Sequence, residues 1–143
     1  ETRVVDNVLE IRSQTRMLGY LNADSPFDKD GWYNTKDIVE ERDGYYKVTG
    51  RTSEVINVGG LKFMASEVER VALQYDNVEL VKAEAKPNPI TGQHVELTVQ
   101  SATSNEVDKA GLKTFLTEQL PNHMMPKRIK VASVSVGHRF KRA

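Results

Sequence analysis

The hydrophobic positions in the second half of the chain follow two different periods. Val95, Leu97 and Val99 recur at every second residue, which predicts a strand over 94–99 with one buried face. Val68, Val71 and Ala72 recur at spacings of three and four, which predicts a helix over 66–74 with one apolar face. This half of the chain therefore mixes strands and helices.

Weaker patterns fill in the elements on either side. A helix capped by Ser104 or Asn105 and running to about Gln119 would bury an apolar stripe. A strand over 78–86 would be stopped by the prolines at 87 and 89, and further strands are expected at 55–58, 62–64 and 129–134. The order β-β-α-β-β-α-β predicts a small α+β domain over 53–143, with two helices on one sheet.

Residues 1–52 are rich in strand-forming positions and poor in helix. Strands are expected at 8–11 and 45–49, the second entered by the turn Arg42-Asp43-Gly44, and a surface loop at 22–31. The segment has too few apolar residues to form a convincing core of its own. We therefore expect 1–52 to be the β-rich tail of a larger amino-terminal domain that is missing here.

Composition narrows the classes of chemistry. The 143 residues contain no cysteine, which excludes disulfides, thiolate catalysis and zinc–cysteine sites. No run approaches the roughly 20 apolar residues of a membrane span, and no amino-terminal signal is present. His94, His123 and His138 lie at spacings that form no metal site. We expect a cytoplasmic protein without a membrane span or a metal ion held by its own side chains.

Positive charge gathers toward the end of the chain. The net charge is zero, yet no acidic residue follows Glu118, while six basic residues do: Lys127, Arg128, Lys130, Arg139, Lys141 and Arg142. Such an end is either a solvated surface or a site for a polyanion, such as a nucleotide phosphate, coenzyme A or RNA. An RNA-binding module should interleave aromatic and basic residues, and here only Phe140 lies among them. We expect no nucleic-acid partner.

Three short segments could carry chemistry. Arg51 has a planar donor fork suited to a phosphate or a carboxylate. Gly59 and Gly60 permit positive φ and the close approach of a slender ligand. Asp37 could accept the two hydroxyls of a ribose. Each also has a plain structural interpretation, as a strand arginine, a hairpin turn and a turn-forming aspartate, and the residues alone favour that interpretation.

The order of these segments resembles the carboxyl end of the adenylate-forming (AMP-forming) acid ligases. This family contains acyl-CoA synthetases, luciferases and peptide-synthetase adenylation domains. The matching segments are Trp32-Tyr33-x-Thr35-x-Asp37, Gly50-Arg51, Gly59-Gly60 and a lysine close to the terminus. The resemblance covers nearly the whole chain but only the last part of such an enzyme.

The resemblance implies an enzyme that works in two steps with its own amino-terminal domain. ATP, with Mg²⁺, activates a carboxylic acid as an acyl-adenylate, and a thiol then displaces AMP. The segment 55–60 is more similar to acyl-CoA synthetases, which favours coenzyme A; the pantetheine arm of a carrier protein is the alternative. This fragment alone is expected to be inactive, because the family's phosphate loop and acid pocket lie upstream.

The resemblance also assigns roles to residues in the first half. In the family, the aspartate that corresponds to Asp37 holds the AMP ribose, and the arginine that corresponds to Arg51 contacts the ribose and phosphate region. The hinge about which the carboxyl domain swings falls at Ser53, where the family normally has Asp or Lys. The chain also has Lys36 where the family usually has glycine, so a ligase-like domain whose catalysis has lapsed is a further possibility.

Two more roles fall in the second half. Gly59 and Gly60 would line a tunnel for the pantetheine arm. A lysine near the terminus would neutralise charge that develops on the carboxylate and α-phosphate during adenylation. Lys141 is the residue expected in that catalytic role, with Arg139 as the competitor.

Overall fold

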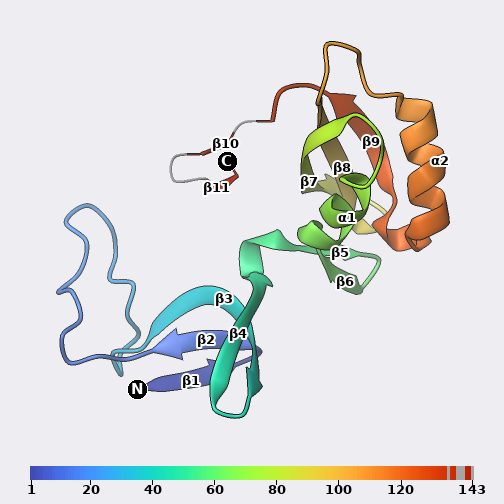
Figure 1. Ribbon diagram of the computed structural model, residues 1–143. Helices are drawn as coiled ribbons and strands as arrows, with labels where there is room; N and C mark the ends of the chain where they lie inside the picture. The colour runs from blue at the N-terminus through green and yellow to red at the C-terminus, as the bar shows by residue number, and fades with distance from the viewer. Residues whose placement is uncertain (135, 138–140, 143) are drawn as a thin grey trace. The chain divides into compact units, whose positions relative to one another are not determined.

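The computed structural model describes residues 1–134, 136–137 and 141–142, and it divides the chain into two compact units (Figure 1). Unit 1 is Glu1–Ser53 and unit 2 is Glu54–Ala143. The division falls one residue after the boundary expected from the sequence. The assignment of the first segment to a larger domain stays a prediction.

Unit 1 is built on an antiparallel sheet in the order β1 (Thr2–Val5), β2 (Val8–Ile11), β3 (Tyr33–Arg42) and β4 (Tyr45–Arg51). Two-residue turns join β1 to β2 and β3 to β4, and φ is positive at both residues of each: 50° and 64° at Asp6-Asn7, 52° and 77° at Asp43-Gly44. Such turns match the twist of the strands they join. The predicted turn at 42–44 and the strand at 8–11 are confirmed, whereas β1 was not predicted and β4 runs two residues further than expected.

Unit 1 buries few of its apolar side chains. Val8 and Val39 are buried. Eight of the eleven large hydrophobic side chains that are exposed among the described residues belong to this unit, and two of them, Leu18 and Leu21, are fully exposed. A surface of this kind is typical of protein that packs against further protein.

Unit 2 is the α+β domain that the sequence predicts. Its sheet has the order β6 (Leu61–Met64), β5 (Val55–Val58), β8 (Gly92–Ser101), β7 (Val78–Asn88), and β9 (Pro126–Val131) runs parallel to β8. The helices are α1 (Ala65–Ala72) and α2 (Lys109–Gln119), with short 3₁₀ turns at η1 (Thr52–Glu54), which begins in unit 1, and η2 (Asn122–Met124). A separate strand pair, β10 (Val136–Gly137) and β11 (Lys141–Arg142), follows.

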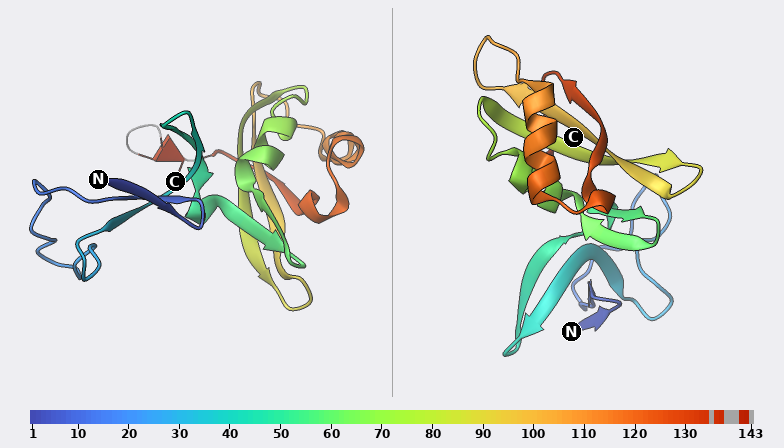
Figure 2. Two further views of the ribbon diagram at one scale, coloured as in Figure 1. Left: turned by 90° about the horizontal axis from the view of Figure 1, so that it is seen from below. Right: turned by 90° about the vertical axis from the view of Figure 1, so that its right-hand side faces the viewer.

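The core of unit 2 lies between the sheet and its two helices (Figure 2). Val95, Leu97 and Val99 of β8 are fully buried, as their alternation predicts. They pack in one cluster with side chains from both helices, namely Val68 and Ala72 of α1 and Leu112 and Leu116 of α2. No helix among the described residues is long and apolar enough to cross a membrane.

Two predicted element boundaries in unit 2 are wrong. The second helix begins at Lys109, not near Ser104, because Asp108 caps it by accepting the Ala110 N–H at 3.0 Å. β7 passes through Pro87 to Asn88 instead of stopping at Lys86. A proline is tolerated there because β7 lies at the edge of the sheet, where its missing N–H needs no partner.

The last strand of the sheet is also displaced from its prediction. β9 runs over Pro126–Val131 and not over 129–134. Its pairing with β8 begins at Val95–Pro126 and ends at Val99–Val131, so the partner strand sets its bounds.

Candidate functional site

The segment that contains Asp37 is a bulge in the sheet of unit 1. Glu10 pairs with Asn34 and Val8 pairs with Ile38, so that Leu9 of β2 faces three residues of β3, Thr35, Lys36 and Asp37. The Thr35 hydroxyl donates to the Leu9 carbonyl at 2.7 Å and accepts the Asp37 N–H at 3.1 Å. A bulge re-aims the side chains beside it, and here those side chains include the predicted ribose ligand.

Asp37 and Arg51 form a cross-strand ion pair. The two residues are partners in the β3–β4 ladder, and Arg51 Nε donates to Asp37 Oδ1 at 2.7 Å. Their side chains are 28% and 46% exposed, so the pair is open to solvent and adds little to stability. The structure therefore brings the two predicted nucleotide-binding residues together on one surface, as a carboxylate beside a planar cation.

Lys36 occupies the left-handed region of backbone space, with φ of 65°. Its N–H donates to Asn34 Oδ1 at 2.9 Å, an Asx-type turn that holds the conformation. Lysine thus takes the backbone conformation that glycine adopts without steric cost. The sequence reasoning missed Asn34, although an asparagine two residues before a bulge is a recognisable turn signal.

Replacing Lys36 with glycine should stabilise the chain. The left-handed conformation costs a non-glycine residue about 1–2 kcal/mol, and the extra freedom of glycine in the unfolded chain offsets part of the gain. We expect the free energy of unfolding in urea to rise by up to about 1 kcal/mol. Lys47→Gly in β4, where φ is not positive, is the control and should lower it; a loss in Lys36→Gly would contradict the prediction.

The entry to β3 is fixed by Asp28 and two arginines. Asp28 Oδ1 accepts the N–H groups of Trp32 and Asp30 at 2.8 and 2.9 Å. The bond from Trp32, together with that from Asp30 and the charge of Arg3, holds the pKa of Asp28 below its ordinary value. The guanidinium carbons of Arg3 and Arg12 lie 4.2 and 4.7 Å from the centre of the Trp32 ring. Trp32 therefore anchors the start of the strand that carries Asp37.

Gly59 and Gly60 form the two-residue turn between β5 and β6. Their φ angles are 61° and 88°, the pattern of a type I′ turn, which strongly favours glycine and asparagine. A Cβ atom added at either residue would meet no atom within 4 Å among the described residues, apart from its own chain neighbours. The glycines are therefore required by backbone conformation, and the space beside them is open.

The glycine turn is tied to the turn between β7 and β8. The Gly59 N–H donates to the Thr91 carbonyl at 2.9 Å, and the Asn57 N–H donates to Gln93 Oε1 at 2.8 Å. Neither Thr91 nor Gln93 was singled out from the sequence, because these bonds join segments more than thirty residues apart.

The other two predicted site residues lie in segments of different character. Ser53 is exposed, in the 3₁₀ turn η1 at the end of unit 1. The backbone of Lys141 belongs to β11 and pairs with Gly137. The side chain of Lys141 and the whole of the competitor, Arg139, lie outside the described residues.

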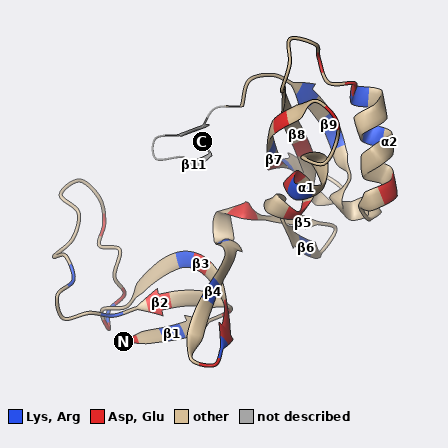
Figure 3. Cartoon of the chain, viewed as in Figure 1, with Lys and Arg blue, Asp and Glu red and all other residues tan. Residues whose placement is uncertain are grey.

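Two residues of the basic end form ion pairs within unit 2. Figure 3 shows where the charged residues lie along the chain. Lys130 Nζ lies 2.9 Å from Glu96 Oε2, and Arg128 Nε lies 3.9 Å from Glu96 Oε1. The hydrogen bond from Lys130, with the charges of both residues, holds the pKa of Glu96 below its ordinary value. These two cations therefore serve an internal ion cluster, which favours the plain interpretation of the basic residues over a polyanion site.

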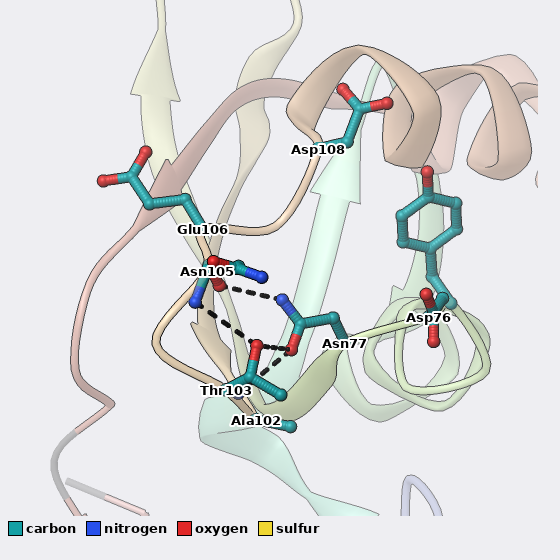
Figure 4. Close-up of a pocket in the computed structure, with 8 residues that line it drawn as sticks. Asp76, Asn77, Ala102, Thr103, Asn105, Glu106 and Asp108 are labelled. Atoms are coloured by element: carbon teal, nitrogen blue, oxygen red, sulfur yellow. Dashed lines mark hydrogen bonds between the residues drawn. The ribbon is translucent and has the colours of Figure 1, made fainter.

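A hollow of about 570 Å³ lies on unit 2 (Figure 4), and the residues that line it include none of the predicted site residues. Asn77 closes one side of it, donating to the Asn105 carbonyl at 2.8 Å and accepting from the Thr103 N–H at 3.0 Å. These bonds hold the loop before α2 in place. The Asn77 side chain, which lines the hollow, therefore has a structural role. The described residues contain no group of three or more His, Asp or Glu side chains that could hold a metal ion.

Known proteins are similar to this chain in sequence and in fold. No protein-family profile matches the chain. The chain is 33% identical over 118 residues to a long-chain-fatty-acid–CoA ligase of Salmonella typhimurium, which covers 80% of this chain and 21% of that protein. It is 35% identical over 106 residues to the fatty acid–[acyl-carrier-protein] ligase MmaC of Mycobacterium marinum, covering 71% and 20%.

The fold is likewise shared with solved structures. The ATP-bound MatB from Rhodopseudomonas palustris matches with a TM-score of 0.79 at 21% identity, over 94% of this chain and 28% of that one. The chain thus spans about a fifth of the curated relatives that it matches and under a third of this structure.

Proposed function

This chain belongs to the family of CoA ligases and related adenylate-forming enzymes, and we propose that it is the carboxyl-terminal part of one that activates a carboxylic acid with ATP. In the first step the carboxylate attacks the α-phosphorus of ATP, which forms an acyl-adenylate and releases pyrophosphate. In the second step a thiol attacks the acyl carbonyl and displaces AMP. Mg²⁺ would accompany the nucleotide, because the phosphate oxygens of ATP bind this hard cation.

The observation that carries this proposal is the pair formed by Asp37 and Arg51. A ribose offers two neighbouring hydroxyl donors, and a carboxylate can accept both. The guanidinium of Arg51, whose Nε lies 2.7 Å from Asp37 Oδ1, provides a cation for the phosphate side of the nucleotide. The pair is solvent-exposed within its unit, as a site completed by another domain requires.

The second step would use the glycine turn of unit 2. A pantetheine arm is slender, and we propose that it passes over Gly59 and Gly60, since neither residue has a side chain and, in the part of the chain that the structure describes, a Cβ added at either would meet no atom within 4 Å beyond its chain neighbours. Coenzyme A is the proposed thiol. The alternative thiol is the pantetheine arm of a carrier protein. It is supported by the similarity to MmaC, a fatty acid–[acyl-carrier-protein] ligase.

Rotation of the carboxyl-terminal domain about Ser53 would switch the enzyme from the first step to the second. We propose that Lys141 lies at the reacting carboxylate during adenylation and leaves it when the glycine turn takes its place. Ser53 suits a hinge since it is exposed and lies at the division between the two units. The missing amino-terminal domain would supply the phosphate loop and the acid pocket, and it would cover the apolar side chains that unit 1 leaves exposed.

Removing the Asp37 carboxylate should weaken nucleotide binding. Hydrogen bonds to a charged group contribute about 1.5–3 kcal/mol, so Asp37→Ala in the complete protein should raise the KM for ATP roughly ten- to hundredfold. The measurement is ATP–pyrophosphate exchange, with Glu40→Ala, an exposed carboxylate on the same strand, as the matched control. An unchanged KM would overturn the proposal; the 143 residues alone should show no exchange.

The competing function, an RNA-binding module, makes the opposite prediction for the isolated chain. It requires RNA binding that weakens steeply with salt, driven by the basic end. The pairing of Lys130 and Arg128 with Glu96 removes two of the cations that such binding would use. We therefore rank this function second.

A further inference from the structure

The bulge in β3 places a single hydroxyl beside Asp37, the residue proposed to bind the ribose. Thr35 has one O–H donor, which goes to the Leu9 carbonyl of β2 at 2.7 Å. The same oxygen accepts the N–H of Asp37 at 3.1 Å. One side chain therefore joins the neighbouring strand to the backbone of the residue whose carboxylate faces Arg51.

The geometry of the bulge depends on such a bond. Because Leu9 faces three residues of β3, the regular ladder cannot pair all of their backbone groups in this stretch. Lys36, in the middle, has φ of 65°, a conformation that persists in a non-glycine residue only where its surroundings hold it. The Asn34 side chain accepts the N–H of Lys36, and the Thr35 hydroxyl accepts the N–H of Asp37, so both backbone groups are held by side chains.

We propose that Thr35 is a positioning residue for nucleotide binding: its hydroxyl fixes the bulge and thereby sets the place of the Asp37 carboxylate beside Arg51. This rests on the proposed function, because it takes Asp37 as the ribose ligand. Valine has the shape of threonine but neither donates nor accepts a hydrogen bond, so Thr35→Val would release both the Leu9 carbonyl and the Asp37 N–H. The carboxylate would then lose its fixed distance to Arg51.

The test compares ATP–pyrophosphate exchange in Thr35→Val, Thr35→Ser and Asp37→Ala variants of the complete protein. Loss of one ordering hydrogen bond should raise the KM for ATP in Thr35→Val on the order of tenfold, with kcat nearly unchanged since the ribose is remote from the reacting atoms. Thr35→Ser keeps the hydroxyl and should restore the KM. Thr117→Val is the control, because it likewise removes a hydroxyl that donates to a backbone carbonyl, that of Lys113 at 2.8 Å, but within α2 of unit 2.

The outcomes separate this inference from the function beneath it. If Asp37→Ala raises the KM and Thr35→Val does not, the inference is overturned and the proposed function stands. If Asp37→Ala leaves the KM unchanged, the proposed function is overturned, and the inference with it. Should Thr35→Val fail to fold, Thr35→Ala takes its place, and a KM in Thr35→Ser as high as in Thr35→Ala would also overturn the role of the hydroxyl.

Discussion

Gly60→Leu in the complete protein should abolish thioester formation while ATP–pyrophosphate exchange continues. The turn at Gly59-Gly60 has an open space beside it, since an added Cβ would meet none of the described residues within 4 Å except its chain neighbours. A leucine side chain would fill that space, and the proposed pantetheine arm must pass through it. Adenylation would use a different face of the carboxyl-terminal domain and should be spared. Transfer of a supplied acyl-adenylate to coenzyme A measures the second step alone.

A second glycine variant separates bulk from backbone strain. Gly60 has φ of 88°, so any side chain other than that of asparagine or aspartate adds strain of about 1–3 kcal/mol. Gly60→Ala carries a similar backbone penalty as Gly60→Leu without the bulk, and it should retain most of the thioester activity. Equal loss in both variants would assign the effect to the turn conformation, and normal activity in a folded Gly60→Leu would remove the turn from the mechanism.

The sheet of unit 2 could be predicted from sequence where one face alone is buried. Val95, Leu97 and Val99 alternate strictly because every second side chain of β8 enters the core, and the strand was found on that basis. The start of α2 could not be found in this way. Three residues that favour helix caps, Ser104, Asn105 and Asp108, lie close together, and Asp108 prevails because Asn77 already holds the Asn105 carbonyl in the preceding loop.

The candidate site was predictable as a set of residues but not as a geometry. The chemistry of Asp37 and Arg51, together with the family resemblance, predicts their roles, whereas their pairing depends on two bulges, one at Thr35–Asp37 and one opposite Ile38 and Val39. A bulge shifts the register without changing the hydrophobic pattern strongly, so no periodicity in the sequence encodes it. The contact of Gln93 with Asn57 is hidden for another reason, since it joins strands distant in the chain.

Lys141→Ala should lower the rate of acyl-adenylate formation on the order of a hundredfold or more, because it removes a positioned cation where negative charge develops. The same variant should convert a supplied acyl-adenylate to thioester at nearly the normal rate, since the proposed hinge motion withdraws this lysine before the thiol attacks.

The two half-reactions therefore provide the decisive comparison. Lys141→Arg tests whether charge alone suffices: arginine keeps the cation but spreads it over a planar fork, so only partial recovery of adenylation is expected. Arg139→Ala is the matched control, two residues away on the same basic segment. If adenylation and thioester formation fell equally in Lys141→Ala, Lys141 would have a structural role. If adenylation fell selectively in Arg139→Ala instead, the catalytic cation would be Arg139, and the lysine assigned by resemblance would be wrong.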